Sequence, residues 1–207
     1  MTETPRRRDA TATRAAILAS ARRCFARSGY DGVGVREIAE GAGVTAMMVN
    51  RYFGSKERLL GEVVAGIMAE PTILTRANLE SPDFAARIAA LLVDITGADA
   101  TPLDGFLIML RSASSDQAAV IAREQIEAHY HRVLTEALDG DLAPQRAAIV
   151  LAIVSGIQVM RQVVALSALA EADADQLKAL LEPLFRQLLT PVLTCSALQE
   201  APWGHGQ

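Results

Sequence analysis

The sequence predicts an all-α protein, and its composition and patterning both contribute to that prediction. Aromatic residues make up only 4% of the 207 positions, and few segments alternate apolar and polar residues as half-buried strands do. Segments rich in alanine and leucine, separated by short breaks, are instead typical of helices. Hydrophobic residues (51%) and charged residues (21%) are close to globular averages, so the chain is long and apolar enough to bury a core.

Four helices are predicted in the first 70 residues. Apolar residues at three- and four-residue spacing indicate helices over 14–27, 35–42, 45–53 and 55–70. The last two begin at a threonine and a serine, whose hydroxyl groups accept hydrogen bonds from the free N–H groups of the first turn. A proline directly after the fourth segment ends it, because the residue before a proline avoids helical geometry.

The rest of the chain is predicted to form longer helices with short breaks. These helices cover 82–96, 103–113, 116–138, 143–168 and 174–190. Pro183 lies inside the last of them and predicts a kink or a break, since proline lacks an N–H group and its ring clashes with the preceding turn. We expect two domains, over 1–54 and 55–193, followed by a mobile tail over 194–207.

Charge is distributed unevenly along the sequence. Residues 1–60 contain eleven Lys or Arg and six Asp or Glu, which gives a net charge of +5. The remaining 147 residues contain nine basic and eighteen acidic residues, which gives −9. A basic first part on an acidic body suggests that the first part meets a polyanion. The alternative is a chance fluctuation of solvated charge, and charge alone does not decide between the two.

Residues 35–53 have the anatomy of a helix-turn-helix. Two short helices that cross closely need a small residue at the contact, which Ala39 supplies. The turn between them needs a positive φ, which Gly43 adopts at no steric cost. Val44 and Val49 lock the second helix against the first, and Phe53 is a further buried anchor. The alternative is a packed hairpin without a DNA role, which leaves the exposed face of the second helix unexplained.

Residues 10–60 resemble the DNA-binding domain of the tetracycline-repressor (TetR) family of bacterial regulators. The matching segments are VREIAEGAGV at 35–44 and RYFGSKERLL at 51–60, and the resemblance covers about a quarter of the chain. It implies an all-helical fold with three N-terminal helices, a connecting fourth helix, and a C-terminal domain that binds a ligand and dimerises. The rest of the chain agrees with the family in length and helical pattern.

The resemblance also implies which residues contact DNA. It places a recognition helix over 45–52 in the major groove, with Arg36 near base edges or phosphate. Thr45 and Lys56 match positions that contact phosphates in the family. The predicted DNA-binding residues are Arg36, Thr45, Ala46, Met47, Asn50, Arg51, Tyr52 and Lys56.

One position of the recognition helix departs from the family pattern. The sequence has Asn50 where the family usually has a tyrosine. Two interpretations stay open: Tyr52 takes over the phosphate contact of the missing tyrosine, or Asn50 or Arg51 reads an adenine or guanine edge. We also expect one of Met47 and Met48 to pack inward and the other to contact a thymine methyl group.

The segment from Ala147 to Leu169 is apolar nearly all the way round, so a helix there must bury both faces. With the final helix of each subunit it predicts a four-helix dimer seam, as the family resemblance also implies. The predicted interface residues are Ile149, Ile153, Ile157, Met160, Leu181, Leu184 and Leu188. The alternative is a wholly intrachain core. A dimer suits a palindromic operator, because it presents two recognition helices about one DNA turn apart.

Two other helices carry a candidate ligand pocket, apolar with a few polar groups. Its residues are Phe106, Met109, Leu110, Ile126, His129 and Tyr130. For each of these residues, ordinary core packing is the alternative. No metal site is expected: His129 and His131 fall on different faces of one helix, and Glu127 with His131 is more often a solvated pair.

These patterns predict a ligand-responsive transcriptional regulator, most simply a homodimeric repressor that binds a palindromic operator and is released by an unidentified small molecule. The competing class is an all-helical enzyme, but HExxH, GxxxxGK[ST] and GxSxG patterns are absent, so neither catalytic residues nor a cofactor are expected. A structural DNA binder would not need so large an acidic, apolar body.

A cytoplasmic location is predicted from three features. The N-terminus has no apolar run behind its basic residues, unlike a secretory signal. Cys24 and Cys195 cannot form a disulfide framework, which suits a reducing compartment. The longest nearly apolar stretch, Ala147–Met160, is shorter than the roughly 18 residues of a membrane span, so no membrane partner is expected.

Overall fold

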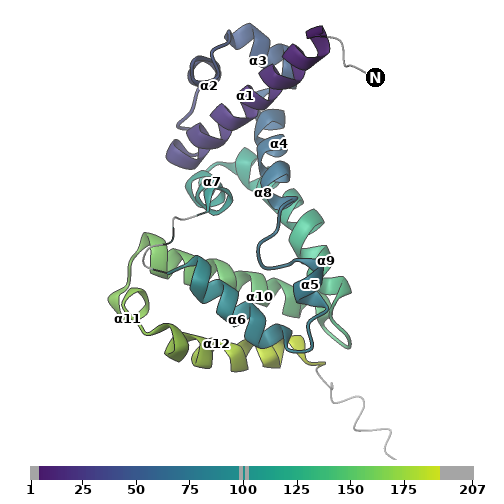
Figure 1. Ribbon diagram of the computed structural model, residues 1–207, viewed down its shortest axis with the longest axis vertical. Helices are drawn as coiled ribbons and strands as arrows, with labels where there is room; N and C mark the ends of the chain where they lie inside the picture. The colour runs from purple at the N-terminus through teal and green to yellow at the C-terminus, as the bar shows by residue number, and fades with distance from the viewer. Residues whose placement is uncertain (1–4, 98–99, 101–102, 192–207) are drawn as a thin grey trace, which may run out of the picture. The chain divides into compact units, whose positions relative to one another are not determined.

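The computed structural model describes residues 5–97, 100 and 103–191, with side chains from residue 9 onward (Figure 1). In this part of the chain every regular element is a helix, which confirms the predicted fold class. The chain divides into two compact units: unit 1 is Met1–Pro71 with Thr101–Tyr130, and unit 2 is Thr72–Ala100 with His131–Gln207. The tail predicted over 194–207 lies outside the described residues.

Unit 1 combines the N-terminal helices with two helices from later in the chain. Its elements are α1 (Pro5–Ser28), α2 (Val35–Gly41), α3 (Ala46–Phe53), α4 (Lys56–Met68), α7 (Asp104–Ser112) and α8 (Asp116–Ile126). Helix α1 packs against α2, α4 and α7, and α4 packs against α8. All of them contribute to one apolar core, in which Phe25, Ile38 and Leu59 are fully buried.

Helix α1 begins nine residues earlier than the predicted start at residue 14. Pro5 occupies its first position, where the missing N–H group of proline costs nothing because the first N–H groups of a helix have no partner within it. The buried side follows the predicted spacing, with Ile17, Ala21 and Phe25 at 0% exposure. Gly29 ends the helix at φ +69°, the left-handed conformation expected there.

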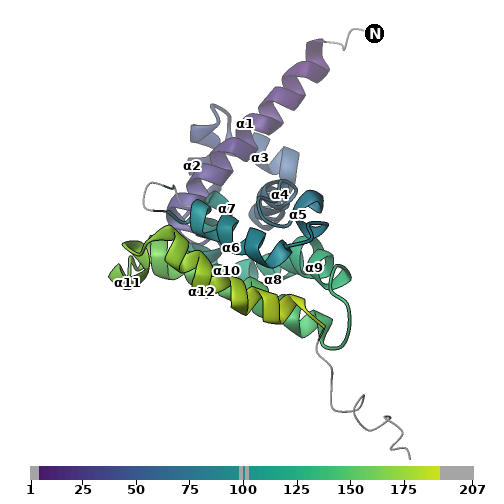
Figure 2. The ribbon, with the colours of Figure 1, turned by 60° about the horizontal axis from the view of Figure 1, so that its bottom comes forward.

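Unit 2 consists of helices around a contact between α6 and α12. Its elements are α5 (Arg76–Leu79), α6 (Phe84–Ile95), α9 (Arg132–Glu136), α10 (Ala143–Gln158), the π-helical turn η2 (Val159–Val163), α11 (Ser167–Ala170) and α12 (Ala174–Leu189). A second π-helical turn, η1 (Glu127–His131), connects α8 to α9. Helix α12 packs along α6 and also contacts α10 (Figure 2).

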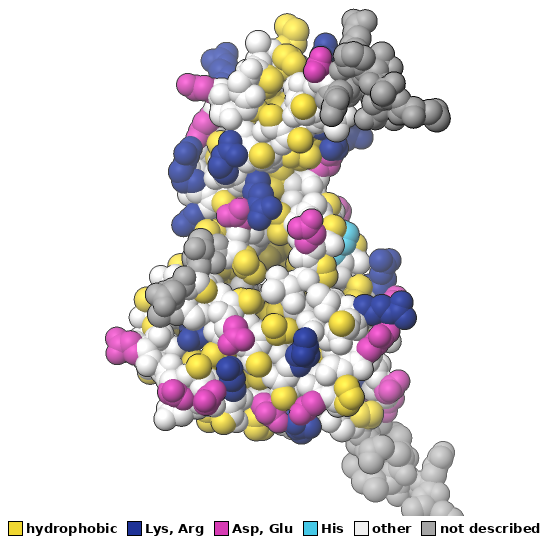
Figure 3. Space-filling view, viewed as in Figure 1, with side chains coloured by type: hydrophobic (Ala, Val, Ile, Leu, Met, Phe, Trp, Pro, Cys, Tyr) yellow, Lys and Arg dark blue, Asp and Glu magenta, His cyan; other side chains and the backbone are white. Residues whose placement is uncertain are grey.

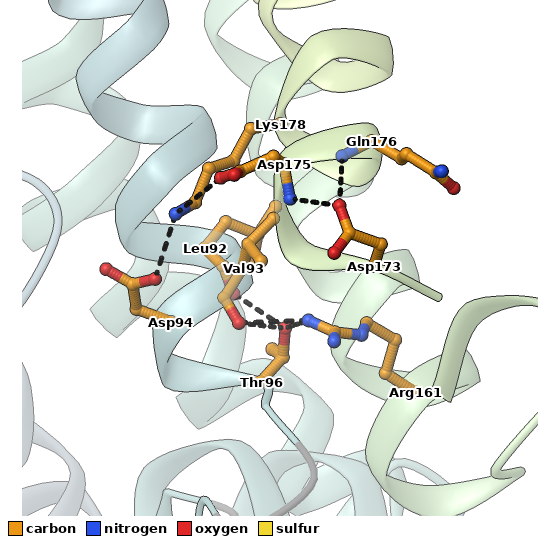
Figure 4. Close-up of polar contacts among 9 residues, drawn as sticks. All are labelled: Leu92, Val93, Asp94, Thr96, Arg161, Asp173, Asp175, Gln176 and Lys178. Carbon is orange, nitrogen blue, oxygen red and sulfur yellow. Dashed lines mark hydrogen bonds and ion pairs between the residues drawn. The ribbon is translucent and has the colours of Figure 1, made fainter. Parts of the chain in front are cut away.

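Arg161 in η2 is buried and links η2 to α6 and α11 within unit 2; Figure 4 shows its contacts with the end of α6. Its guanidinium donates to the carbonyl of Val93 at 2.9 Å, to the hydroxyl of Thr96 at 2.5 Å and to the carbonyl of Leu169 at 3.0 Å. Val93 and Thr96 lie at the end of α6, where carbonyl groups lack helical partners. Burial lowers the pKa of Arg161 from its ordinary value.

Arg146 plays the same part at the other end of α10. Its guanidinium donates to the carbonyls of Leu188 at 3.1 Å and Thr190 at 2.8 Å, at the end of α12. It also donates to the carbonyls of Asp139 and Asp141 in the loop before α10. Two arginines that flank the apolar stretch of the sequence are therefore structural links inside unit 2.

The later helices differ from the predicted ranges in three places. The predicted helix 143–168 ends at Val163, and Ser167–Ala170 forms the separate helix α11. The short helix α5 was not predicted. Of the kink or break expected at Pro183, the break is absent, because α12 runs through this residue, which is exposed; the kink stays a prediction.

The two compact units do not follow the boundary predicted after residue 54. Helix α4 buries Leu59, Leu60, Val63 and Val64 in the core that it shares with α1, so it belongs to the same unit as the helix-turn-helix. Helices α7 and α8 join this unit as well. The functional division into a DNA-binding part over 1–54 and an effector and dimer part over 55–193 stays a prediction.

Candidate DNA-binding surface

The turn between α2 and α3 has the geometry predicted for a helix-turn-helix. Gly43 adopts φ +67°, and a Cβ atom there would meet nothing within 4 Å. The requirement for glycine is therefore one of backbone conformation and not of space. The N–H groups of Gly43 and Val44 donate to the carbonyls of Glu40 and Ala39, both at 3.0 Å, which closes the turn.

Helix α3 is fixed by a cap at its start and by two buried anchors. The hydroxyl of Thr45 accepts a hydrogen bond from the N–H of Met48 at 3.3 Å, as expected for an N-cap. Val49 and Phe53 are buried, with exposures of 2% and 4%, and Ala39 of α2 is buried at 3%. The orientation of α3 therefore decides which of its side chains face solvent.

The exposed side of α3 carries most of the residues predicted to read DNA. Met47 is 80% exposed, and Asn50 and Arg51 are also exposed; we call these three residues the base-reading face. Met48 is half-buried, so Met47 is the methionine that points to solvent. A thioether, an amide and a guanidinium are side chains that match a thymine methyl group, an adenine edge and a guanine edge.

The other predicted DNA-binding residues of the helix-turn-helix lie beside this face. Thr45 and Arg36 are exposed, whereas Ala46 and Tyr52 are half-buried. The guanidinium carbon of Arg51 lies 5.6 Å from the centre of the Tyr52 ring, so the two side chains stack. This contact leaves the choice between Tyr52 and Arg51 as the DNA-contacting group a prediction.

Lys56, predicted to bind phosphate, has partners within its own unit. Its ammonium donates to the carbonyl of Val33 at 2.8 Å and lies 4.1 Å from the centre of the Tyr30 ring. These contacts hold the start of α4 against the loop after α1. Lys56 therefore has a structural role in the helix-turn-helix, and its phosphate contact stays a prediction.

Several large apolar side chains of α10, η2 and α12 in unit 2 are exposed. Ile149, Met160, Val163, Leu180 and Leu184 are each between 42% and 69% exposed, and we call them the apolar surface. The predicted interface residues Ile149, Met160 and Leu184 belong to it. Small residues lie among them on α10, where a Cβ atom on Gly156 would meet nothing within 4 Å.

The remaining predicted interface residues are less accessible. Ile153, Ile157 and Leu188 are half-buried. Leu181 is only 5% exposed and packs inside its own unit, so the accessible leucine of that turn of α12 is Leu180, at 69%. Leucines occur on nearly every side of α12, so the sequence did not show which of them is buried within the chain. The interface itself stays a prediction.

Comparisons with known proteins identify the family. A family model described as "Bacterial regulatory proteins, tetR family" matches residues 17–63, and one described as "Tetracyclin repressor-like, C-terminal domain" matches residues 83–189, about half of the chain. The chain belongs to the TetR family. It is therefore a regulatory protein by family, and the first of these matches contains the helix-turn-helix and its base-reading face.

Two curated relatives are similar to the N-terminal part of this TetR-family chain. The HTH-type transcriptional repressor AcnR of Corynebacterium glutamicum is 45% identical over 82 residues, which is 35% of this chain and 44% of the relative. AcnR of Corynebacterium efficiens is 38% identical over 80 residues, 34% of this chain and 43% of the relative. The matched region thus spans less than half of the length of these relatives.

Solved structures share the fold along most of the chain. A TetR-family regulator from Streptomyces coelicolor is 25% identical with a TM-score of 0.58, and the match covers 91% of this chain and 99% of that one. NalD of Pseudomonas aeruginosa, the secondary repressor of the MexAB-OprM multidrug efflux pump, is 21% identical with a TM-score of 0.60, covering 86% and 96%. The TetR architecture therefore extends over both units.

In this TetR-family chain the end of α1, which packs against α2 of the helix-turn-helix, is held to α7 by close contacts within unit 1. The backbone carbonyl of Arg111 lies so near Gly29 that a Cβ atom on Gly29 would overlap it. The Arg111 guanidinium donates to the carbonyl of Ala26, and the N–H of Tyr30 donates to the Ser112 hydroxyl at 2.9 Å. Sequence analysis missed this contact, which depends on residues about 80 positions apart.

A polar cluster extends the same contact to α4. The Tyr30 hydroxyl donates to the Glu57 carboxylate at 2.5 Å. Hydrogen bonds from Ser55 and from Tyr30 lower the pKa of Glu57 to about 2, and burial together with the adjacent carboxylate raises the pKa of Tyr30 above its ordinary value. At neutral pH the cluster therefore holds an ionised glutamate and a neutral tyrosine.

The predicted pocket residues all lie in unit 1. Phe106 is buried, and the other five (Met109, Leu110, Ile126, His129 and Tyr130) are half-buried. Met109, Ile126 and Tyr130 pack against the core that also contains the helix-turn-helix, and burial raises the pKa of Tyr130. The Oε1 atom of Gln125, one helical turn before His129, is buried and accepts no hydrogen bond from the described residues.

Two further expectations bear on partners. Among the described residues no group of three or more His, Cys, Asp or Glu side chains is placed to hold a metal ion. By length and composition alone, Ala143–Val163 would suffice to cross a membrane, although the apolar stretch in the sequence was judged too short. Only 22% of its most apolar window is buried, and its two arginines bind carbonyls of unit 2.

Proposed function

We propose that this TetR-family chain is a cytoplasmic, ligand-responsive transcriptional repressor without catalytic activity. It binds a palindromic operator as a homodimer, with residues 1–54 as the DNA-binding part and 55–193 as the effector and dimer part. The observation that carries the proposal is the base-reading face, because Met47, Asn50 and Arg51 are exposed on a helix whose other side is fixed. The relatives named above are repressors, which favours repression over activation.

Charge supports nucleic acid as the partner of unit 1. Figure 3 shows acidic side chains along the edge of unit 2 and several basic side chains on unit 1. Arg14, Arg22 and Arg27 of α1 pair with Glu62, Asp104 and Glu37. Within the described residues, Arg36 makes no ion pair, which leaves its charge available to a phosphate or a guanine edge.

The apolar surface supports dimerisation through α10 and α12. Large apolar side chains that are 42% to 69% exposed cost solvation free energy in a single chain, so covering them with a second copy is favourable. Ala148, Ala152 and Gly156 recur every four residues on the open side of α10 and let another helix approach closely. A symmetric dimer presents two copies of α3 to successive major grooves.

Release by a small molecule is supported by the way unit 1 is built. Helix α7, which carries Phe106, Met109 and Leu110 of the pocket, is bonded to the end of α1 and the loop after it through Arg111 and Ser112. A ligand that moves α7 therefore also moves α1 and the helix-turn-helix packed on it. A releasing ligand must bind the free form more tightly than the DNA-bound form, typically by ~1–3 kcal/mol. The buried Oε1 of Gln125 favours an apolar ligand that carries one hydrogen-bond donor.

The test of DNA recognition begins with duplexes selected by the wild-type chain from a random-sequence pool. Asn50→Ala and Arg51→Ala should each lose about 1–3 kcal/mol of discrimination at one base pair of the selected site. Arg132→Ala, an exposed arginine of unit 2, is the matched control and should bind as the wild type does. Unchanged sequence selectivity in both α3 variants would refute the assignment of the base-reading face.

The test of release screens apolar small molecules for thermal stabilisation of the wild-type chain. A compound that stabilises the protein should also weaken its binding to the selected duplex, because both effects follow from preference for the free form. Met109→Gln and Tyr130→Ala should blunt both effects. If a compound stabilises the chain but, at saturation, leaves its affinity for the duplex unchanged, release by a ligand is refuted. The proposed DNA-binding function is not affected by that result.

A further inference from the structure

The sulfur-containing side chains of this chain differ widely in their exposure to solvent. Met47 is 80% exposed, and the next most exposed methionine among the described residues, Met160, is 42% exposed. The other described sulfur-containing residues are half-buried or buried: Met48, Met109, Met68 and Cys24. Because oxidation of a thioether follows its exposure, and a buried thiol is inert, an oxidant reaches Met47 first among these side chains.

Met47 is also the exposed methionine that belongs to the base-reading face. It lies in the first turn of α3, and the N-terminal residues of a recognition helix contact base edges. Asn50 and Arg51 follow three and four residues later, on the same side of the helix. Val49 and Phe53 anchor the opposite side in the core. A chemical change at the Met47 sulfur therefore acts on the surface that meets DNA.

Oxidation alters this position without a cost to the core. The sulfur lone pair attacks one oxygen of hydrogen peroxide, an S–O bond forms as the O–O bond breaks, and the proton on the new S–O group joins the departing hydroxide as water. Sulfur loses two electrons and the peroxide gains them. The product, a sulfoxide, is polar and chiral. At Met68, 4% exposed, its oxygen would be buried in the core, whereas at Met47 water solvates it in the free chain.

We propose that Met47 is an oxidation switch: a peroxide converts it to the sulfoxide in the free chain, and the sulfoxide weakens binding to operator DNA. This inference rests on the proposed DNA-binding function and adds redox control to it. A thioether matches a thymine methyl group, whereas a sulfoxide oxygen pressed against a methyl group or an acceptor of the groove loses water without gaining a hydrogen bond. Methionine sulfoxide reductases reverse the oxidation, so the switch returns to its first state.

The experiment uses the full chain and a duplex selected by the untreated wild type from a random pool. The free chain is exposed to hydrogen peroxide, and at each time point peptide mass spectrometry measures oxygen addition at every methionine and at Cys195, beside the affinity for the duplex. Met47→Leu removes the sulfur with little change in volume. Met160→Leu is the matched control at the next most exposed methionine, and Cys195→Ser removes a thiol outside the described residues. Each variant is compared with its own untreated form.

Oxygen addition should appear first at Met47 among the described residues. In the wild type, Met160→Leu and Cys195→Ser, affinity should fall in step with the sulfoxide at Met47, by roughly 10- to 100-fold at full conversion, as for a mismatched base contact. Met47→Leu should keep its untreated affinity throughout. Methionine sulfoxide reductases for both epimers should restore the wild type, whereas their thiol reductant alone should not. Saturating duplex added before the peroxide should slow oxidation of Met47 and leave that of Met160 unchanged.

Three results would overturn the Met47 switch. The first is full conversion of Met47 with untreated affinity, while Arg51→Ala weakens binding; the proposed function then stands without redox control. The second is an equal loss of affinity in Met47→Leu and the wild type, which places the sensitive group elsewhere. The third is a loss of helical content, by circular dichroism, in step with the sulfoxide at Met47, which means that oxidation unfolds the chain. If the untreated wild type enriches no sequence from the pool, the proposed function fails and the switch fails with it.

Discussion

Helices α3 and α10 both bury one side in their own unit and leave the other side open, but the open sides differ in chemistry. The base-reading face of α3 mixes Met47, Asn50 and Arg51, whereas the exposed large side chains of α10, such as Ile149, are apolar. A mixed face suits DNA, whose major groove presents methyl groups, donors and acceptors side by side. An apolar face suits another apolar protein surface, because contact between the two removes both from water. Exposure alone therefore does not identify a partner, and the kind of exposed side chain does.

The largest expected effect tests the apolar side of this comparison. Ile149→Glu places a carboxylate at an exposed position of α10. Because Ile149 is already 48% exposed, the substitution should lower the stability of unit 2 itself only slightly. Burying an unpaired charge at an interface costs several kcal/mol, so the dimer dissociation constant should rise roughly 100-fold or more. Sedimentation velocity at several concentrations measures the change. Duplex binding should fall with it, because two linked recognition helices bind more tightly than one.

Ala119→Glu is the control for that change, since it introduces the same charge at an exposed position of α8 in unit 1. It should remain dimeric and bind the selected duplex as the wild type does. If Ile149→Glu is folded, dimeric and normal in DNA binding, the interface lies elsewhere and the apolar surface needs another occupant.

The next prediction separates a structural cation from a DNA-contacting one beside the base-reading face. Lys56→Ala removes a half-buried charged hydrogen bond to Val33 and the contact with the Tyr30 ring, so the free energy of unfolding should fall by about 1–3 kcal/mol. Arg36→Ala should change stability by no more than about 0.5 kcal/mol but weaken duplex binding. Urea titrations and duplex binding of both variants measure this, with exposed Arg58→Ala as the control.

Equal stability of the Lys56 and Arg36 variants would contradict the structural role of Lys56. If Lys56→Ala leaves stability unchanged but lowers the slope of log affinity against log salt by about one unit, Lys56 contacts a DNA phosphate, as the sequence predicts.

The sequence was sufficient for local structure and insufficient where distant residues meet. The turn at Gly43 and the cap at Thr45 follow from residues within one short segment, so the helix-turn-helix was predicted correctly. The contact of Gly29 with Arg111 could not be predicted, because nothing local marks which backbone approaches a glycine 82 positions away. For the same reason the sequence did not show that α7 and α8 share a unit with α1.

At two helices, α1 and α12, the sequence prediction differed from the structure although the relevant residues lie within the helix itself. Pro5 before three arginines is a common first position of a helix, and weighting it more heavily would have extended α1 to its observed start. On α12 the leucines at 180, 181, 184 and 188 cover most of the helix surface, so periodicity could not select the buried one. The packing of α12 on α6 and α10 makes that selection.

A smaller effect concerns the cluster that holds the helix-turn-helix behind the base-reading face. The pKa of Glu57 is about 2 in the folded chain against an ordinary value of 4.5. Because the folded pKa is depressed, the stabilisation is complete above about pH 4.5 and is lost as the pH falls toward 2. Glu57→Gln should therefore flatten the loss of stability over this window, as measured by urea titrations at pH 7, 4.5 and 3. Tyr30→Phe should have the same sign, since it removes one of the hydrogen bonds that lower the pKa; a pH dependence identical to the wild type in both variants would contradict the cluster.

The smallest expected effect lies at the end of the apolar surface, where Ala165 follows η2 with φ +53°. The N–H groups of Val164 and Leu166 donate to the carbonyls of Val159 and Met160, both at 2.9 Å, so the helix end closes around a left-handed residue that usually is glycine. A left-handed alanine costs roughly 1–2 kcal/mol, and glycine loses about 1 kcal/mol more conformational entropy on folding, so Ala165→Gly should raise the free energy of unfolding by about 0.5–1 kcal/mol. Ala119→Gly, at an exposed position one turn into α8, should lower the free energy of unfolding by about as much, because glycine there only weakens a helix. Changes in unfolding free energy of opposite sign in the two variants, measured by urea titration, identify the left-handed cap. An unchanged dimer in sedimentation shows that the cap supports unit 2 without forming part of the interface. Equal destabilisation in both variants would mean that the helix does not end at Ala165 in this way.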